Sequence, residues 1–162
     1  MTAQADDILA VLLLPGPLEG FAREQHARGL LSIPRVVALE ASRRRPPGFF
    51  RDAACQRQAQ RLRFPGRPRL LVLYYPAQYP LARALCARYQ DLELCYLPPG
   101  REARQSADDV SFDALARERA ALVLEASAGD ADDEPLRARL RELGVINPRA
   151  FLPGANPRWR SR

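Results

Sequence analysis

The stretch Arg69–Pro80, RLLVLYYPAQYP, decides how the chain folds. Its residues Leu70 to Tyr75 are apolar or aromatic without alternation, and a proline stands on either side of them. A continuous run of that length predicts a strand that is buried on both faces of a sheet. A short loop with Gln78 and Tyr79 follows, and then a helix. Strand, loop and helix in this order are the unit of a parallel α/β sheet, which binds its ligands at the loop edge.

The same unit recurs along the chain. Strands are predicted at 8–14, 35–41, 70–75, 92–97 and 120–125, and helices at 21–31, 49–63, 81–89, 111–119 and 134–143. Ser111 is expected to cap the fourth helix, and Gly144 to end the fifth. The alternation predicts a single Rossmann-like α/β domain: a five-stranded parallel sheet with helices on both faces. We expect the strand order 3-2-1-4-5, with the binding crevice between the first and fourth strands.

Length and composition set the broad class. The chain has 162 residues, of which 47% are hydrophobic, enough to bury the core of one domain. That domain is expected at 8–152, between a polar lead at 1–7 and a flexible basic tail at 153–162. The net charge is +6, and every basic residue is arginine, which fits a GC-rich coding bias and also an affinity for nucleic acid, anionic lipid or phosphorylated molecules.

Cysteine and histidine counts exclude a zinc site, since the chain has three cysteines without a CxxC pair and one histidine. Free thiols in a reducing cytosol are the simplest interpretation. The apolar run Ile8–Leu14 is shorter than the roughly 20 residues of a membrane span, and two aspartates precede it. We therefore expect no signal peptide, no transmembrane segment and a cytoplasmic location, at most peripheral at the inner membrane face.

The first loop and helix offer one set of candidate binding residues. Gly16 and Gly20 stand where the first helix begins, so that backbone N–H groups there can face a phosphate, although the spacing also suits a plain strand-to-helix turn. Arg23 and His26 lie three residues apart and share a helix face. His26 can serve as a general base, or it is a surface histidine.

Later loops offer a second set. Glu40 and Glu125 fall near the carboxyl ends of predicted strands, where they can act as acid and base, bind sugar hydroxyls, or pair with arginines. Ser127 can cap a helix or bind phosphate. Tyr79 is expected to be exposed in its loop, on the rim of the sheet and away from the crevice. Tyr74 is expected in the core.

Two basic clusters are candidates for phosphate or nucleic-acid contact. They are Arg43, Arg44 and Arg45, and the tail segment RWRSR at 158–162, where Trp159 can stack on a base. Solvated charge is the alternative interpretation of both clusters.

Several segments together resemble one family. They are QHARGLLSIPRVVALEASRRRPP (Gln25–Pro47), LVLYYPAQYPLARAL (Leu71–Leu85), RERAALVLEAS (Arg117–Ser127) and FLPGAN (Phe151–Asn156). They are similar to parts of the N-terminal, acceptor-side Rossmann-like domain of retaining GT-B glycosyltransferases, of the family 4 type that builds teichuronic acid and other polysaccharides.

The resemblance implies a function. In that family the sugar nucleotide binds mainly in a second domain, so this chain would bind an acceptor in its crevice and need a partner chain for donor binding and transfer. A sugar or lipid-linked acceptor is then implied, with no cofactor or metal of its own. Gly16, Gly20, Arg23 and His26 would line the crevice, and later loops would contribute the substrate-binding residues Tyr79, Glu125 and Ser127. The alternative is a non-catalytic subunit of a larger assembly, or a homo-oligomer, that uses its arginines to bind protein, nucleic acid or anionic lipid.

Overall fold

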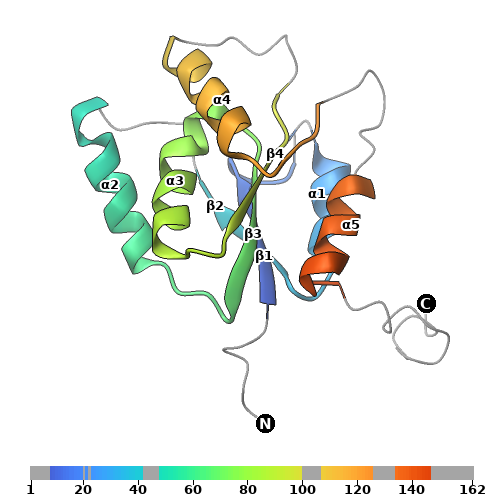
Figure 1. Ribbon diagram of the computed structural model, residues 1–162. Helices are drawn as coiled ribbons and strands as arrows, with labels where there is room; N and C mark the ends of the chain where they lie inside the picture. Colours follow the sequence, from blue (N-terminus) through green and yellow to red (C-terminus); the bar gives the residue numbers. More distant parts are fainter. Residues whose placement is uncertain are drawn as a thin grey trace, which may run out of the picture.

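The computed structural model of the chain describes residues 8–19, 21, 23–41, 48–99, 107–125 and 134–146. Five parallel strands form one sheet in the order β2-β1-β3-β4-β5 (Figure 1). The strands are β1 (Ile8–Leu14), β2 (Val36–Glu40), β3 (Arg67–Leu73), β4 (Glu93–Tyr96) and β5 (Leu122–Val123). The predicted fold class, a five-stranded parallel α/β sheet with helices on both faces, is confirmed.

The strand order differs from the expected 3-2-1-4-5, because β3 lies beside β1 and β2 is an edge strand. Burial explains the arrangement. Leu70 to Leu73 are all buried, and such a strand needs a neighbour on each side as well as helices on both faces. In β2, by contrast, Ala38 and Glu40 are exposed, which an edge strand tolerates. The continuous apolar run at 70–75 therefore belongs inside the sheet.

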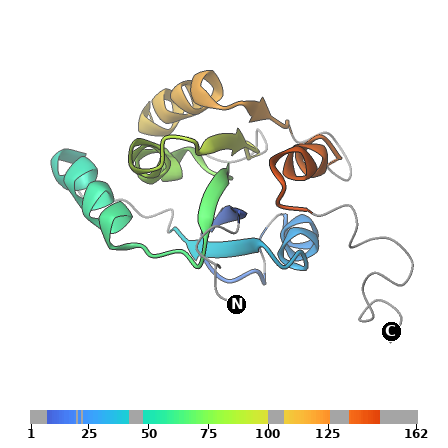
Figure 2. The ribbon, with the colours of Figure 1, turned by 60° about the horizontal axis from the view of Figure 1, so that its bottom comes forward.

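Five helices cover the two faces. They are α1 (Glu24–Leu31), α2 (Gly48–Arg61), α3 (Tyr79–Arg88), α4 (Ala107–Arg119) and α5 (Glu134–Leu143). Helices α1 and α5 lie on one face and α2, α3 and α4 on the other (Figures 1 and 2). The step from β1 to β2 runs in the opposite direction to the later steps, so right-handed crossovers place α1 on the opposite face from α2, α3 and α4.

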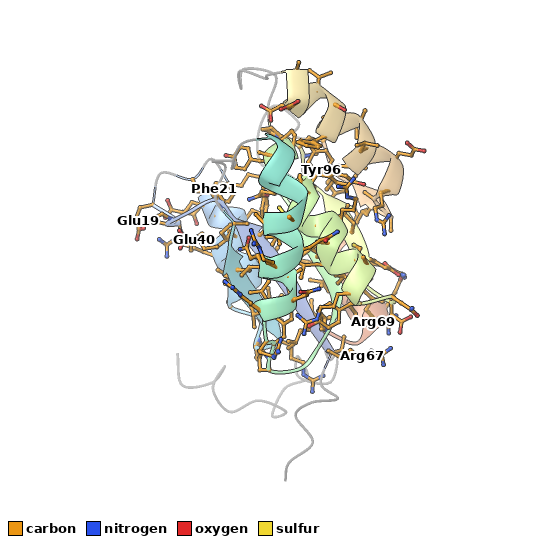
Figure 3. All side chains as sticks on the ribbon, turned by 90° about the vertical axis from the view of Figure 1, so that its left-hand side faces the viewer. Glu19, Phe21, Glu40, Arg67, Arg69 and Tyr96 are labelled. Atoms are coloured by element: carbon orange, nitrogen blue, oxygen red, sulfur yellow. The ribbon has the colours of Figure 1, made fainter. Side chains whose placement is uncertain are left out.

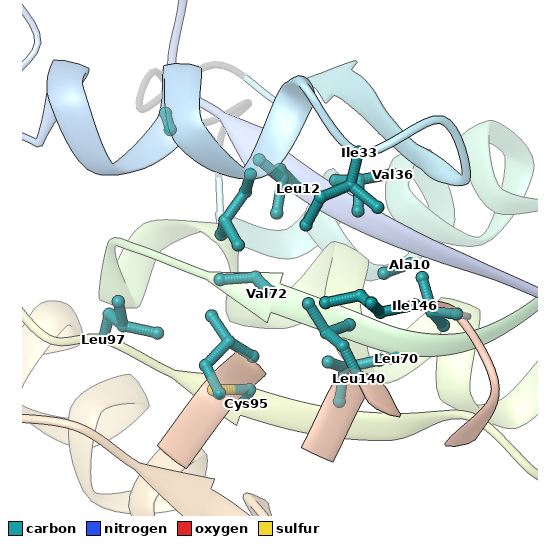
Figure 4. Close-up of a cluster of buried hydrophobic side chains, with 14 of the residues drawn as sticks. Ala10, Leu12, Ile33, Val36, Leu70, Val72, Cys95, Leu97, Leu140 and Ile146 are labelled. Atoms are coloured by element: carbon teal, nitrogen blue, oxygen red, sulfur yellow. The ribbon is translucent and has the colours of Figure 1, made fainter. Parts of the chain in front are cut away.

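Each face of the sheet has its own core. On the α1 and α5 face, Leu12 and Val72 of the sheet pack with Ile33 and with Leu140 of α5 (Figure 4). On the other face, Val11 and Leu13 point toward α3 and α4 in a separate cluster. Successive residues of β1 thus contribute to alternate cores, because successive side chains of a strand point to opposite faces of the sheet. The first core draws residues from β1, β2, β3, β4, α1 and α5, and the second from β1, β3, β4, α2, α3 and α4.

Two predicted helix ends can be compared with the structure. Gly144 has a φ of 87° just after α5, so its predicted role as the C-terminal cap is confirmed. The predicted cap at Ser111 is wrong, because α4 begins at Ala107 and Ser111 lies inside it. Asp108 and Asp109 occupy the first turn of α4, where their negative charge favours the positive end of the helix.

None of the helices in the described parts of the chain is both long enough and apolar enough to cross a membrane.

Candidate functional site

The carboxyl ends of β1 and β3 mark the point where the topology of the sheet reverses. The chain leaves β1 for α1 on one face and leaves β3 for α3 on the other. Doubly wound sheets bind ligands where two such loops part. The switch point, where we expected the binding crevice, therefore lies between the first and third strands and not between the first and fourth. The loop after β3, which we expected at the outer side of the sheet, borders it.

Gln78 closes the α3 side of this edge. Its side chain is 1% exposed, and it lies in a short 3₁₀ turn, η2 (Pro76–Gln78), just before α3. Its Oε1 accepts hydrogen bonds from the backbone N–H groups of Tyr74 and Tyr75, at 3.0 and 3.1 Å. Its Nε2 donates to the carbonyl oxygens of Leu13 and Ala41, at 2.9 and 3.1 Å. One amide thus joins the ends of β1, β2 and β3.

Gln78 is a functional position that was not predicted from the sequence. The available signal was its position as the one polar side chain in an otherwise apolar stretch directly after a buried strand. A buried polar group must be satisfied, and a primary amide can bond both N–H and C=O groups of strand ends.

Arg23 lies on the α1 side of the same edge. Its side chain is half-buried, and its Nη2 donates a hydrogen bond to the carbonyl oxygen of Pro98 just after β4, at 2.9 Å. The guanidinium therefore extends from the start of α1 over the end of β3 to β4. Burial lowers the pKa of Arg23, and the nearby Tyr74, Tyr75 and Glu125 oppose that shift. A cation thus stands at the predicted binding edge.

His26 contacts Tyr74 beside this cation. The His26 Nε2 and the Tyr74 hydroxyl are 2.9 Å apart, and the two rings meet edge to face with centroids 5.6 Å apart. Tyr74 is 1% exposed, as predicted for a core residue, while His26 is partly exposed. Phe21 packs edge-on against Tyr74 from the β1–α1 loop. His26, predicted as a general base or a surface histidine, is thus a partly buried residue whose ring contacts a tyrosine hydroxyl.

Gly16 leaves open space at the end of β1. A Cβ atom placed on it would meet no heavy atom within 4 Å. Gly16, Arg23 and His26, three residues named from the sequence, therefore lie along one loop and helix at the crevice.

Glu125 follows β5 at the far side of the sheet and forms an ion pair with Arg117 of α4. Arg117 also binds Asp113 at 2.8 Å, and Asp113 accepts a hydrogen bond from the Tyr96 hydroxyl at 2.7 Å. Burial, and then the bond to Asp113, raise the pKa of Tyr96, so its hydroxyl stays protonated. Of the predicted alternatives for Glu125, pairing with an arginine is the one observed.

Glu40 and Glu125 do not form an acid–base pair. They follow β2 and β5, the two edge strands, which are separated by β1, β3 and β4. At the usual strand spacing of about 4.8 Å, four steps place them about 19 Å apart. Figure 3 shows Glu40 near Phe21 and Glu19, at the end of the sheet opposite Arg67 and Arg69.

The prediction that Tyr79 is exposed is wrong. Tyr79 is 4% exposed, because it begins α3 rather than ending a loop, and its ring packs near Phe112 of α4 with centroids 6.2 Å apart. It therefore belongs to the core on the α3 side and cannot line the crevice. Other predicted residues lie outside the described part of the chain: Gly20, Ser127, Arg43, Arg44, Arg45, and the lead and tail at 1–7 and 153–162.

The cysteines differ in accessibility. Cys86 and Cys95 are buried free thiols, and Cys55 is partly exposed. Burial raises the pKa of Cys95 to about 12, with the nearby Arg23 opposing the shift, and burial also raises the pKa of Cys86. A thiol reacts as its thiolate, so both buried thiols are held in the unreactive form.

We expect only Cys55 to react rapidly when the native protein meets a maleimide at pH 7. Raising the pH to 9 should leave Cys95 unlabelled, because that pH is still well below its pKa and the thiol remains protonated. Mass spectrometry of timed samples identifies the labelled residue, and Cys55→Ser is the control that should remove the fast phase. Rapid native labelling of Cys95 would contradict the burial described here.

A surface hollow of about 470 Å³ lies between α2 and α3, away from the crevice. Its lining consists of small, amide and arginine side chains: Gln56, Ala59, Gln60, Pro80, Arg83, Ala84, Ala87 and Arg88. Among the described residues that line it, none is a carboxylate or a histidine, the groups that most often carry acid–base chemistry. Across the described ranges, no three histidine, cysteine or carboxylate side chains are grouped so that they could hold a metal ion.

Comparison with known proteins found no matching family model, no matching curated protein and no matching solved structure.

Proposed function

We propose that the chain is the acceptor-binding half of a glycosyl transfer system, with a sugar or lipid-linked acceptor at the crevice between β1 and β3. A partner chain would bind the sugar nucleotide and complete the transfer site. The observation that carries the proposal is the polar cluster of Arg23, His26 and Tyr74 at the topological switch point, with open space at Gly16 beside it.

The segments that resemble GT-B enzymes support this proposal by their position. His26 comes from the first of them, Tyr74 and Tyr75 from the second, and Glu125 from the third. The Tyr74 hydroxyl of the second segment lies 2.9 Å from the His26 Nε2 of the first. Two separate stretches of sequence thus meet at the carboxyl edge of the sheet.

A thermal-shift panel tests the proposal. The purified chain, alone and with candidate partner chains, is heated with sugars, sugar phosphates and sugar nucleotides. A ligand that binds only the native state raises the melting temperature with concentration, by RT ln(1 + [L]/Kd) in free energy. We expect a sugar-bearing compound to stabilise the chain, and a sugar nucleotide to do so only in the presence of the partner. A panel in which no sugar compound stabilises either form would refute the proposal.

A second candidate function, a non-catalytic subunit of a larger assembly, is favoured by the hollow between α2 and α3. Arg83 and Arg88 are among its lining residues, and arginines suit an acidic segment of a protein partner. Such a complex would weaken steeply with added salt, whereas a neutral sugar in the crevice would respond little.

A further inference from the structure

Arg23 is a half-buried cation at the start of α1. Among the described residues, no carboxylate forms an ion pair with it. Its Nη2 binds the Pro98 carbonyl oxygen, but its Nη1 is fully buried and has no hydrogen-bond partner in that part of the chain. Buried charges are ordinarily paired and hydrogen-bonded, because desolvation is otherwise uncompensated. Within the described ranges, the Pro98 carbonyl oxygen is thus the one hydrogen-bond partner of this guanidinium.

The acidic residues closest to Arg23 in sequence form ion pairs with another arginine, Arg28. Glu24, in the first turn of α1, binds Arg28 at 2.8 Å, and Glu19 lies 3.7 Å from the same guanidinium. Glu125 pairs with Arg117. Three carboxylates close to Arg23 in sequence or in space thus pair with other arginines, and none of them forms an ion pair with Arg23.

The start of α1 adds to the positive potential. Arg23 itself occupies the N-cap position and makes no side-chain capping hydrogen bond. Residues at this position are usually short and polar or acidic, since the first N–H groups and the helix dipole favour negative charge. The positive charge of Arg23 is repelled by the positive end of the helix dipole. An anion bound beside the cap would interact favourably with both positive charges.

We infer that Arg23 binds a phosphoryl group of the ligand at the carboxyl edge of β1 and β3. This inference rests on the proposed function and narrows the acceptor to a phosphorylated one, either a sugar phosphate or a phospholipid headgroup. A phosphoryl group presents several acceptor oxygens, which suit the planar guanidinium and the exposed N–H groups of a helix start together. Gly16 leaves space at the end of β1 for the rest of the ligand.

Titration of the full chain tests this inference, with binding followed by amide chemical shifts at constant ionic strength. The probes are inorganic phosphate, a hexose 1-phosphate, the matching neutral hexose, and phosphatidylcholine vesicles with and without phosphatidic acid. We expect the hexose phosphate to bind more tightly than the neutral hexose. Preference for hexose phosphate over phosphatidic acid identifies a soluble acceptor, and the reverse preference identifies a lipid-linked one.

Arg23→Gln should weaken hexose phosphate binding roughly 10- to 100-fold, as expected for loss of a charge-assisted hydrogen bond. Arg57→Gln, which removes the same charge from an exposed position on α2, is the matched control and should change the affinity less than twofold. Arg23→Lys keeps the charge but not the planar fork, so it should lie between Arg23→Gln and the wild type. Arg23→Lys also tests the role of Arg23 in binding if Arg23→Gln does not fold.

The outcomes separate this inference from the proposed function. Equal binding of hexose phosphate by Arg23→Gln and the wild type would overturn the role of Arg23. If the neutral hexose still bound at Gly16 and Tyr75 in that case, the acceptor site would stand without a phosphoryl group. Binding of inorganic phosphate alone, with no sugar compound in the crevice, would retain the anion site and remove the support for glycosyl transfer.

Discussion

Gln78→Glu is expected to lower the free energy of unfolding by about 3–5 kcal/mol, enough to leave a domain of ordinary stability close to unfolding. The substitution keeps the shape of the side chain but replaces its donating Nε2 by an oxygen. That oxygen would face the carbonyl oxygens of Leu13 and Ala41, at 2.9 and 3.1 Å in the native structure. A buried negative charge would thus meet two acceptors with no donor between them. Urea denaturation at pH 7.5 measures the loss.

Gln58→Glu is the matched control for this prediction. Gln58 is exposed on α2, so the same change of charge should alter stability by less than about 0.5 kcal/mol. Acid offers a second check. Burial raises the pKa of the introduced carboxyl above its value in the unfolded chain. The loss of unfolding free energy relative to wild type should therefore shrink as the pH falls toward about 4.3 and the buried carboxylate takes up a proton. A Gln78→Glu variant as stable as wild type at pH 7.5 would show that the amide does not join the strand ends.

Leu140→Ala is expected to cost about 2–5 kcal/mol. Leu140 is 1% exposed on α5 and packs in the core between that helix and the α1 side of the sheet (Figure 4). Truncation removes apolar contact and leaves a cavity that a close-packed core fills only in part. Thermal and urea unfolding, monitored by circular dichroism, measure the loss.

Leu115→Ala makes the same chemical change at an exposed site. Leu115 is 39% exposed on α4, and we expect its truncation to cost less than about 1 kcal/mol. If the two variants lost equal stability, α5 would not be docked on the sheet through Leu140 as described.

The fold was largely predictable because its signals are local. Continuous apolar runs at 8–14 and 70–75 predicted strands buried on both faces, and leucines at helical spacing predicted α5 with its final glycine, Gly144. Strand order was not predicted, since periodicity carries no information on which strands are neighbours. The exposed Ala38 and Glu40 show why β2 is an edge, and their small and charged side chains were the available signal.

The candidate site was predicted only in part. Gly16, Arg23 and His26 were named from one loop and helix, because residues close in sequence stay close in the fold. The contacts of Arg23 with the Pro98 carbonyl and of His26 with Tyr74 join residues 75 and 48 positions apart, and only the tertiary structure brings them together. Tyr79 was misassigned because α3 begins two residues earlier than its apolar stripe suggested, which turns the ring into the core.

A map of amide chemical-shift changes with hexose 1-phosphate tests most directly whether the edge between β1 and β3 is the binding site. The central claim predicts saturable changes at Gly16, Arg23 and Tyr75, on the α1 side of that edge. It also predicts unchanged amides at Ala59 and Ala84, which line the hollow between α2 and α3. Changes gathered at Ala59 and Ala84, with Gly16 and Tyr75 unaffected, would contradict it and place the interaction of this chain on its arginine-lined helical face.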